Sequence, residues 1–196
     1  DADMKETEAI YGQTDSGMTI IEGHLFLNGK KPIQHRSSYG LGEVIKAALD
    51  NHTEHLVISL GGIGSFDGGA GMLQALGARF YDDEAQIVDM RKGADLIKYI
   101  RRIDLSGVHP QLAKVNIQLM SDFSSRLYGK KSEIMQTYES LDLSQNEAAE
   151  IDNLIWYFSE LFKNELKIAM GPIERGGAGG GIAAVLNSLY QAEILT

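Results

Sequence analysis

The most constraining feature of this 196-residue chain is an apolar run, a glycine-rich turn and a helical pattern in direct succession. The run from His55 to Leu60 is short and ends at two glycines, which predicts a buried parallel strand. Apolar residues at helical spacing then extend from Gly68 to Phe80. Strand, turn and helix in this order make half of a βαβ unit. We therefore predict an α/β fold with a mostly parallel or mixed sheet flanked by helices.

Turn residues and periodicity predict further elements on both sides of this unit. Residues 8–27 are expected to be extended, and two apolar runs around a turn-rich stretch within them predict a β-hairpin. Residues 28–39 are expected to form a loop, and Gly40–Asp50 a helix. A second strand is predicted at Val115–Met120.

The clearest helical pattern runs from Ser144 to about Lys167. Ser144 followed by Glu147 three residues later is a capping box, which marks the start of a helix. A last apolar helix is predicted over Ile182–Leu195, directly after a glycine run at 176–181. Because no linker or repeat interrupts the chain, a single domain is predicted.

Charge and composition exclude several classes of partner. The net charge is −9, and the longest groupings of basic residues are pairs, so nucleic acid and anionic membranes are not expected as partners. No apolar run is long enough for a transmembrane helix. The chain has no cysteine, which excludes disulfides and thiolate metal sites and agrees with a cytoplasmic location. The five histidines lack metal-ligand spacing, so no metal site is predicted in the chain itself.

Glycine is the residue that points most directly to a ligand. Of 22 glycines, six lie between Gly61 and Gly71 and five between Gly176 and Gly181. Glycine turns that open helices expose backbone amides to an anion such as phosphate or carboxylate. The alternative is that these glycines only permit tight turns and close packing. We expect the two clusters to converge in space, with Asp122 beside them.

Two aspartates are candidate catalytic residues because they follow predicted strands. Asp67 lies in the first glycine cluster and Asp122 follows the second strand, and ligand sites of open α/β sheets form at the carboxyl ends of strands. A helix cap for Asp67 and a turn for Asp122 are the structural alternatives. The P-loop and Gly-x-Ser-x-Gly motifs are absent. Gly179–Ala184 fits a relaxed dinucleotide-binding fingerprint but follows no convincing strand.

Several segments resemble those of type I glycerate kinases. Gly61–Leu76 is similar to the Gly-Gly-Ser-Ala-Thr-Asn-Asp-Gly-Gly-Ala-Gly-Met signature of that family, and Ser38–Glu43 to its Ser/Thr-x-Gly-x-Gly-Glu segment. Ile103–Gly107 resembles an Asp-x-Ser-Gly step, and Gly177–Leu186 a late glycine-rich segment. Asp122 matches the first residue of an Asp-Val-x-Asn-Pro-Leu segment, and Glu22 the Glu of an Ile-Glu-Met-Ala strand.

This resemblance implies an enzyme that transfers the γ-phosphoryl group of ATP, with its Mg²⁺, to D-glycerate. It identifies residues 1–196 as the inserted α/β lobe of a two-lobed kinase whose terminal lobe is absent here. A complementary lobe or a homodimer partner is then expected, with a small anionic metabolite such as glycerate as ligand. The implied catalytic residues are Asp67 and Asp122. The implied substrate- or phosphate-binding residues are Glu22, Ser38, Gly40, Gly61, Gly62, Ser65, Gly68, Gly69, Gly177 and Gly180.

Departures from the family pattern predict that the isolated chain is inactive. Ile63–Phe66 replaces Ser-Ala-Thr-Asn, Ser125-Arg126 replaces Asn-Pro, and Tyr138–Asp142 replaces a lysine-bearing loop. Phosphoryl transfer depends on positioned polar and cationic groups, which these changes remove. Phe66 is expected to fill the former pocket or turn into the core. The alternative function is a non-catalytic module that binds a small anion or a protein on the same scaffold.

Overall fold

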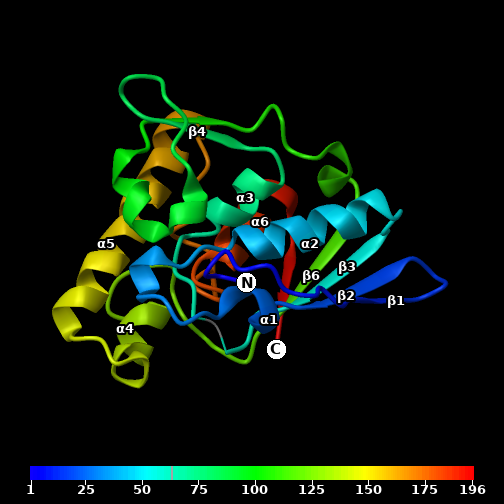
Figure 1. Cartoon of the computed structure of the whole chain (residues 1–196), viewed down its shortest axis with the longest axis horizontal. Helices are drawn as coiled ribbons and strands as arrows, with labels where there is room; N and C mark the ends of the chain where they lie inside the picture. Colours follow the sequence, from blue (N-terminus) through cyan, green and yellow to red (C-terminus); the bar gives the residue numbers. More distant parts are fainter. Residues whose placement is uncertain (63) are drawn as a thin grey trace.

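A five-stranded sheet in the order β1-β2-β3-β6-β7 forms the centre of the molecule (Figure 1). The computed structural model describes residues 1–62 and 64–196, so the Ile63 substitution lies outside the described residues. The strands of the sheet are β1 Gly12–Gln13, β2 Met18–Glu22, β3 His55–Ser59, β6 Asn116–Met120 and β7 Glu193–Leu195. A separate antiparallel pair joins β4 Arg79–Tyr81 to β5 Arg102–Asp104.

The α-helices that surround the sheet within the described residues are α1 His24–Leu27, α2 Tyr39–Asp50, α3 Ala70–Ala75, α4 Glu133–Thr137, α5 Gln145–Leu161 and α6 Ile182–Tyr190. Short 3-10 turns occur at Ile33–His35, Met90–Lys92, Ala94–Tyr99, Pro110–Ala113 and Tyr138–Leu141. Among the described residues, no helix has the length and apolar character that a membrane span requires.

The sheet has the predicted mixed character. β2, β3, β6 and β7 run parallel, whereas β1 pairs with β2 in the antiparallel direction. The predicted hairpin and the two predicted strands are therefore confirmed, but the extended conformation expected up to residue 27 was wrong, because residues 24–27 form α1. The predicted fold class is confirmed as well.

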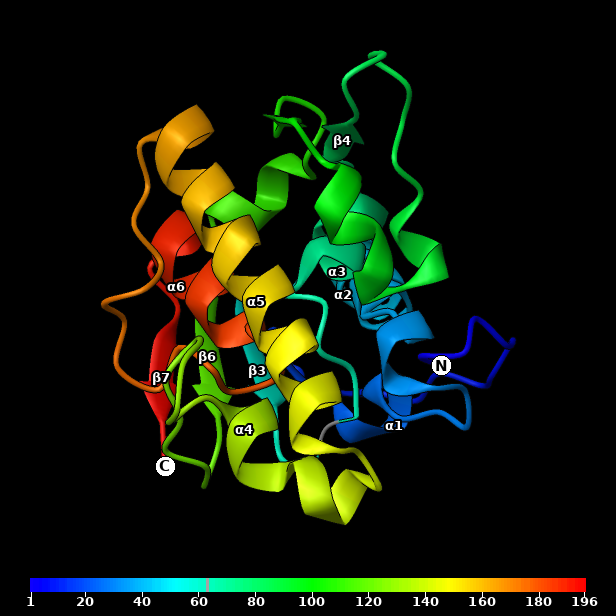
Figure 2. The same ribbon diagram turned by 90° about the vertical axis from the view of Figure 1, so that its left-hand side faces the viewer.

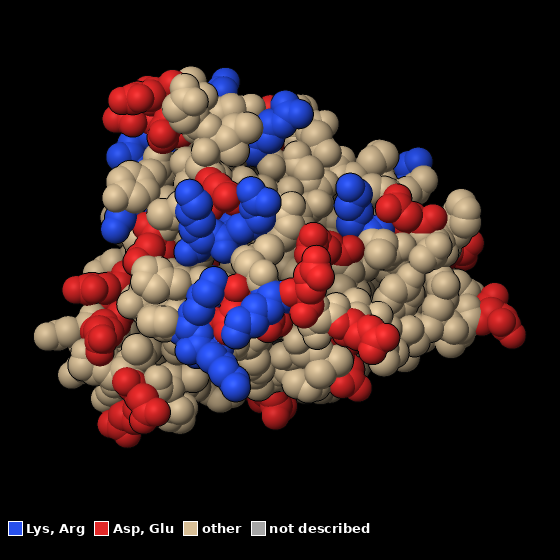
Figure 3. Space-filling model, in the orientation of Figure 1, with Lys and Arg blue, Asp and Glu red and all other residues tan. Residues whose placement is uncertain are grey.

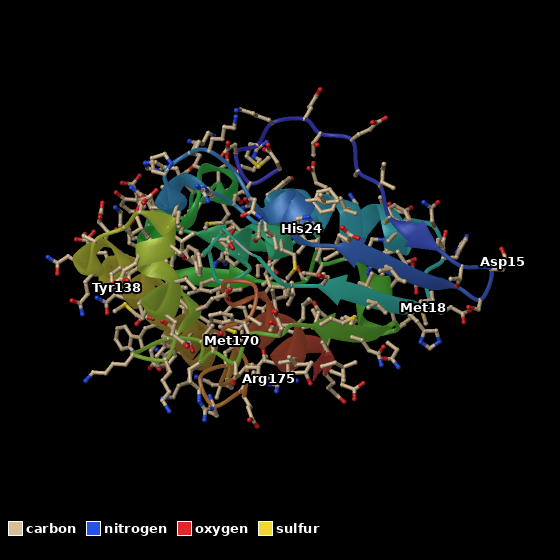
Figure 4. The ribbon with its side chains drawn as sticks, turned by 90° about the horizontal axis from the view of Figure 1, so that it is seen from below. Asp15, Met18, His24, Tyr138, Met170 and Arg175 are labelled. Atoms are coloured by element: carbon tan, nitrogen blue, oxygen red, sulfur yellow. The ribbon has the colours of Figure 1, made fainter. Side chains whose placement is uncertain are left out.

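The helices α2, α3 and α6 lie on one face of this sheet (Figures 1 and 2). Ile21, Ile58 and Leu119 are buried beneath them, as expected for alternate residues of a strand that face a core. On the opposite face, which Figure 4 views, Ile20 and Met120 are 45% and 48% exposed. The single core thus lies between the sheet and one layer of helices.

Two predicted helices are shorter than their apolar patterns. The helix expected to reach Phe80 ends at Ala75, because Gly77 has a φ of +112° and the chain then enters β4. The helix expected to reach Leu195 ends at Tyr190, where Gln191 is left-handed. The residues that follow form β7 against β6, so both extensions were wrong.

The long helix α5 begins as predicted, with a complete Ser144–Glu147 capping box. It continues into a π-helical turn at Phe162–Leu166. Its aromatic face is core: Phe158 packs edge-on against Phe80 and Phe162, with ring centroids 5.8 and 5.0 Å apart.

The two glycine clusters converge, as predicted. The amide of Gly68 donates to the carbonyl of Gly180 at 3.0 Å, and the α-carbon of Gly68 lies against Gly181. Phe158 of α5 covers Gly68, so a β-carbon there would lie 2.9 Å from its ring. The starts of α3 and α6 therefore meet backbone to backbone, which requires glycine at the contact.

We predict that Gly180→Ala destabilises the chain by about 3 kcal/mol or more. Gly180 has a φ of +61°, and a β-carbon there would collide with the carbonyl oxygen of Ser65. Gly129→Ala is the matched control, since Gly129 has a φ of +87° but a β-carbon there would meet no atom of the described residues within 4 Å. It should cost only about 1 kcal/mol. If urea unfolding gave the same loss of stability for Gly180→Ala and Gly129→Ala, packing between the two glycine clusters would be unimportant.

Candidate functional site

The carboxyl ends of β2, β3 and β6 form one edge of the sheet and carry exposed polar groups. Asp122 follows β6 and is exposed to solvent. A β-carbon on Gly61, which follows β3, would lie 3.8 Å from Asp122 Oδ1. The structure therefore brings Asp122 and the first glycine cluster together, as predicted. Open α/β sheets bind ligands at such an edge.

Glu22 and His24 belong to the same edge. Glu22 ends β2, and its carboxylate Oε2 lies 3.9 Å from His24 Nδ1. Figure 4 shows His24 at the opposite end of β2 from Met18. Both side chains of the pair are about half exposed or more, so they are accessible to a ligand.

Asp67 lies in a different environment, because its carboxylate is buried and fully engaged within the chain. Oδ2 accepts hydrogen bonds from the amide and hydroxyl of Ser38 at 2.8 and 2.9 Å and from the amide of Gly71 at 3.1 Å. Oδ1 accepts from the amide of Gly69 at 3.0 Å. The Ser38 hydroxyl in turn accepts from the amide of Met72 at 2.8 Å.

This network joins the first turn of α2 to the first turn of α3. Burial raises the pKa of the Asp67 carboxyl above its ordinary value, although the hydrogen bonds from Ser38 and from the two glycine amides oppose the rise. The N-cap residue of α3 is Gly69 and not Asp67, as the structural alternative supposed, but the Asp67 carboxylate accepts from the amides of Gly69 and Gly71 at the start of that helix. A catalytic role for Asp67 stays a prediction.

The remaining predicted glycines divide between packing and turns. Gly40 lies in the first turn of α2, close to Asp1. Gly62 has a φ of +65°, and its carbonyl accepts from Asn28 Nδ2 at 2.7 Å. Gly69 packs against Ile182, and Gly177 donates its amide to the carbonyl of Ser125.

Two side chains that sequence reasoning missed hold the first glycine loop in place. Asn28 donates to the carbonyl of Gly62, and Arg36 Nη1 donates to the carbonyl of Gly64 at 3.0 Å. Arg36 Nε also donates to the carbonyl of Lys31. Both residues lie in a stretch predicted only as a loop, and no local pattern indicated which loop they would reach.

Lysine side chains lie close to Asn28 and Arg36, although the molecule as a whole is acidic. The backbone amides of Lys30 and Lys31 donate to the buried carboxylate of Asp3, and Lys5 Nζ lies 3.9 Å from it. Burial raises the pKa of Asp3, but the lysine amides and the nearby charges outweigh this, so its pKa lies below the ordinary value. Figure 3 shows basic side chains gathered in the middle of this face, with acidic ones around them.

The second glycine cluster faces a carboxylate that belongs to the chain. Glu133, the first residue of α4, is 7% exposed, and its Oε2 accepts from the amide of Gly180 at 3.3 Å. Burial raises the pKa of Glu133 to about 7, the amides of Gly180 and Gly179 oppose the rise, and the charge of Asp122 adds to it. An acidic residue in the first turn of a short helix is common, so no feature of the sequence singled it out.

Phe66 and Ser65 occupy the positions where the family pattern has polar residues. Phe66 is buried in the core, which confirms that its ring turns inward. The hydroxyl of Ser65 is buried and, like that of Ser125, has no hydrogen-bond partner among residues 1–62 and 64–196. Unpaired buried hydroxyls are uncommon and call for an explanation.

Comparison with known proteins establishes the family. A family model described as the glycerate kinase family matches residues 2–196. This chain belongs to the glycerate kinase family. The resemblance inferred from the motifs is thereby confirmed at the level of the family.

Individual glycerate kinases show how far this similarity extends. The chain is 30% identical over 195 residues to a glycerate kinase of Halalkalibacterium halodurans, covering 96% of the chain and 51% of that protein. It is 30% identical over 158 residues to the glycerate 2-kinase of Escherichia coli K12, covering 81% of the chain and 41% of that protein.

A solved structure agrees at the level of the fold. The crystal structure of a Salmonella typhimurium LT2 protein assigned as glycerate kinase 2 superimposes with a TM-score of 0.86 at 28% identity. The match covers 95% of this chain and 52% of that one. The chain therefore spans about half the length of the glycerate kinases it matches.

We predict that Asp67→Asn destabilises this chain by about 2–4 kcal/mol. Backbone amides donate to both oxygens of the Asp67 carboxylate, so in either orientation of an asparagine side chain its NH₂ group would face at least one N–H donor. Asp122→Asn is the control, because Asp122 is exposed, and it should change urea stability by less than about 0.5 kcal/mol. If Asp67→Asn left the stability toward urea unchanged, the structural role of the Asp67 carboxylate would be contradicted.

We also predict that Glu133 makes stability fall as pH rises from about 4.5 to about 7. The unfolded chain releases this proton near 4.5, whereas the folded chain keeps it until about 7. The contribution of protonated Glu133 to the free energy of unfolding is complete below pH 4.5 and lost above about pH 7. The free energies of unfolding at the two ends of this range should differ by about 3 kcal/mol for this reason. Urea midpoints of Glu133→Gln should lose this dependence, and those of the exposed control Glu150→Gln should retain it. Parallel curves for wild type and Glu133→Gln would refute the assignment.

Proposed function

We propose that this chain is the ligand-binding α/β lobe of a glycerate kinase and acts in ATP-dependent phosphorylation of D-glycerate. The observation that carries the proposal is the similarity to glycerate kinases along nearly the whole chain, together with the exposed polar edge at Gly61 and Asp122. The carbonyls of Gly62 and Gly64 are held by Asn28 and Arg36, and the cationic groups of Arg36 and the nearby lysines favour an anionic substrate at this edge.

Asp122 is the proposed catalytic residue of this lobe. It is the exposed carboxylate beside the first glycine loop, where it can orient or deprotonate a substrate hydroxyl. Glu22 ends β2, which is separated from β6 by β3, and it is proposed to bind substrate hydroxyls at the same edge of the sheet. Asp67 and Ser38 support the site from beneath by joining α2 to α3.

ATP with Mg²⁺ is the proposed cofactor. Mg²⁺ in kinases is held by substrate phosphates and one or two protein carboxylates, and it neutralises charge during transfer. Among the described residues no group of three or more His, Asp or Glu gathers into a metal site of its own. Asp122 and Glu22 could supply the one or two carboxylates that Mg²⁺ needs when it is bound mainly by the phosphates of ATP.

The proposal predicts that activity needs a complementary lobe. The chain should be assayed alone and joined to the remaining half of the Halalkalibacterium halodurans glycerate kinase. We expect turnover below about 1 s⁻¹, an ordinary kinase rate, for the chain alone and glycerate-dependent ADP formation for the joined protein. In the joined protein Asp122→Asn should lower kcat about 10²-fold, while the exposed control Ser124→Ala should not.

Two results would contradict this function. Turnover by the isolated chain would show that no second lobe is needed. A joined protein that folds but neither consumes ATP with glycerate nor binds glycerate would instead support a non-catalytic module on the glycerate kinase scaffold.

A further inference from the structure

Arg36 is a half-buried cation whose guanidinium group is held in one orientation. Its Nε donates to the carbonyl of Lys31 at 2.8 Å, and its Nη1 donates to the carbonyl of Gly64 at 3.0 Å. Arginine has five N–H donors, so these two bonds leave one N–H of Nη1 and both of Nη2 without an acceptor among residues 1–62 and 64–196. Such N–H groups on the two terminal nitrogens can donate to both oxygens of one carboxylate.

No carboxylate of the described residues forms an ion pair with Arg36, although the chain carries 27 acidic residues. Burial lowers the pKa of the Arg36 guanidinium, and the charge of Asp3 only partly opposes this. The Asp3 carboxylate is itself occupied, because the amides of Lys30 and Lys31 donate to its two oxygens at 2.7 and 2.9 Å. Charges that are removed from water are normally paired, so the partner of Arg36 is expected to come from outside the chain.

The guanidinium packs against the first glycine cluster, close to the edge of the sheet that carries Asp122. Arg36 Nη1 and Asn28 Oδ1 both lie 2.5 Å from the position that a β-carbon on Gly64 would occupy, so glycine at this position leaves room for the cation. Gly61, three residues earlier, adjoins Asp122, and three residues of chain span no more than about 11 Å. The unpaired cation and the exposed carboxylate of Asp122 therefore adjoin the same short stretch of the glycine cluster.

We propose that Arg36 binds the carboxylate of a small hydroxy acid and thereby directs a hydroxyl of the same molecule toward Asp122. The inference deepens the proposed function and rests on it, because Asp122 is the proposed catalytic residue. One planar guanidinium with a single charge matches the two oxygens and the single charge of a carboxylate, whereas a phosphate group carries more charge on a tetrahedral set of oxygens. A substrate that lacks the carboxylate is therefore not held in this orientation.

Ligand binding by the 196-residue chain tests the proposal without catalysis. We expect calorimetry to show that D-glycerate binds wild type at least about ten times more tightly than Arg36→Gln, a ratio that corresponds to about 1.4 kcal/mol. Methyl D-glycerate, in which a neutral ester replaces the carboxylate, should bind both proteins equally weakly. Arg36→Lys keeps the charge but not the paired N–H groups and should recover only part of the affinity. The control Lys114→Gln removes an exposed positive charge just before β6, at the amino ends of the strands, and should behave as wild type.

A measurement on wild type alone decides the matter if Arg36→Gln does not fold. The guanidinium resonances of Arg36 in nuclear magnetic resonance spectra should shift with D-glycerate and not with methyl D-glycerate, whereas those of Arg101, which donates to Tyr157 and to backbone carbonyls, should not shift with either.

Three results would overturn the proposal. They are the absence of D-glycerate binding by wild type at millimolar concentration, equal binding by wild type and a folded Arg36→Gln, and a larger shift of the Arg36 resonances with inorganic phosphate than with D-glycerate. These measurements contain no ATP, so they are independent of the kinase assay. A failed kinase assay beside intact glycerate binding would reject the catalytic function and not the binding role of Arg36.

Discussion

The architecture depends on the close approach of two glycine-rich backbones, Gly68 before α3 and Gly180 before α6. One hydrogen bond joins them, and any side chain at the contact would push the two helices apart. Phe158 of α5 closes over Gly68, so the long helix is placed by the same contact. The starts of α3 and α6, the position of α5 and the shape of the sheet edge all follow from this approach.

Such a contact leaves backbone amides that the helices themselves do not pair, and buried amides need acceptors. The chain supplies two carboxylates for this purpose. Asp67 accepts from the amides of Gly69 and Gly71 at the start of α3, and Glu133 accepts from that of Gly180. The glycine clusters thus do meet anionic groups, but in this structure those groups belong to the chain, and an external anion stays a prediction.

The parts of the fold that could be predicted from the sequence are those with a strong local signal. Only a few consecutive residues are needed to recognise the apolar run of β3, the capping box of α5 and the glycine clusters. β4 and β7 were missed because three residues are too few to show a strand period, and each continues an apolar helical pattern. Only the left-handed residues Gly77 and Gln191 mark those boundaries, and glutamine carries no turn signal.

The positions of site residues could be predicted only for residues that directly follow a strand in the sequence. Asp122 and Gly61 follow β6 and β3, and their proximity is a consequence of parallel pairing. Asn28, Arg36 and Glu133 act on loops at least 28 residues away in sequence, so only the tertiary structure reveals them. The same reasoning explains why Asp67 looked like a ligand-binding residue: its donors from Ser38 are 29 residues distant.

The central claim is that the Glu133 carboxylate accepts hydrogen bonds from the amides of the late glycine segment. The most direct measurement is the pH dependence of the Gly179 and Gly180 amide resonances by nuclear magnetic resonance in wild type and Glu133→Gln. We predict that both resonances titrate with an apparent pKa of about 7 in wild type and do not titrate in the variant. Resonances that stay constant with pH in wild type, or that titrate equally in both proteins, would contradict the account.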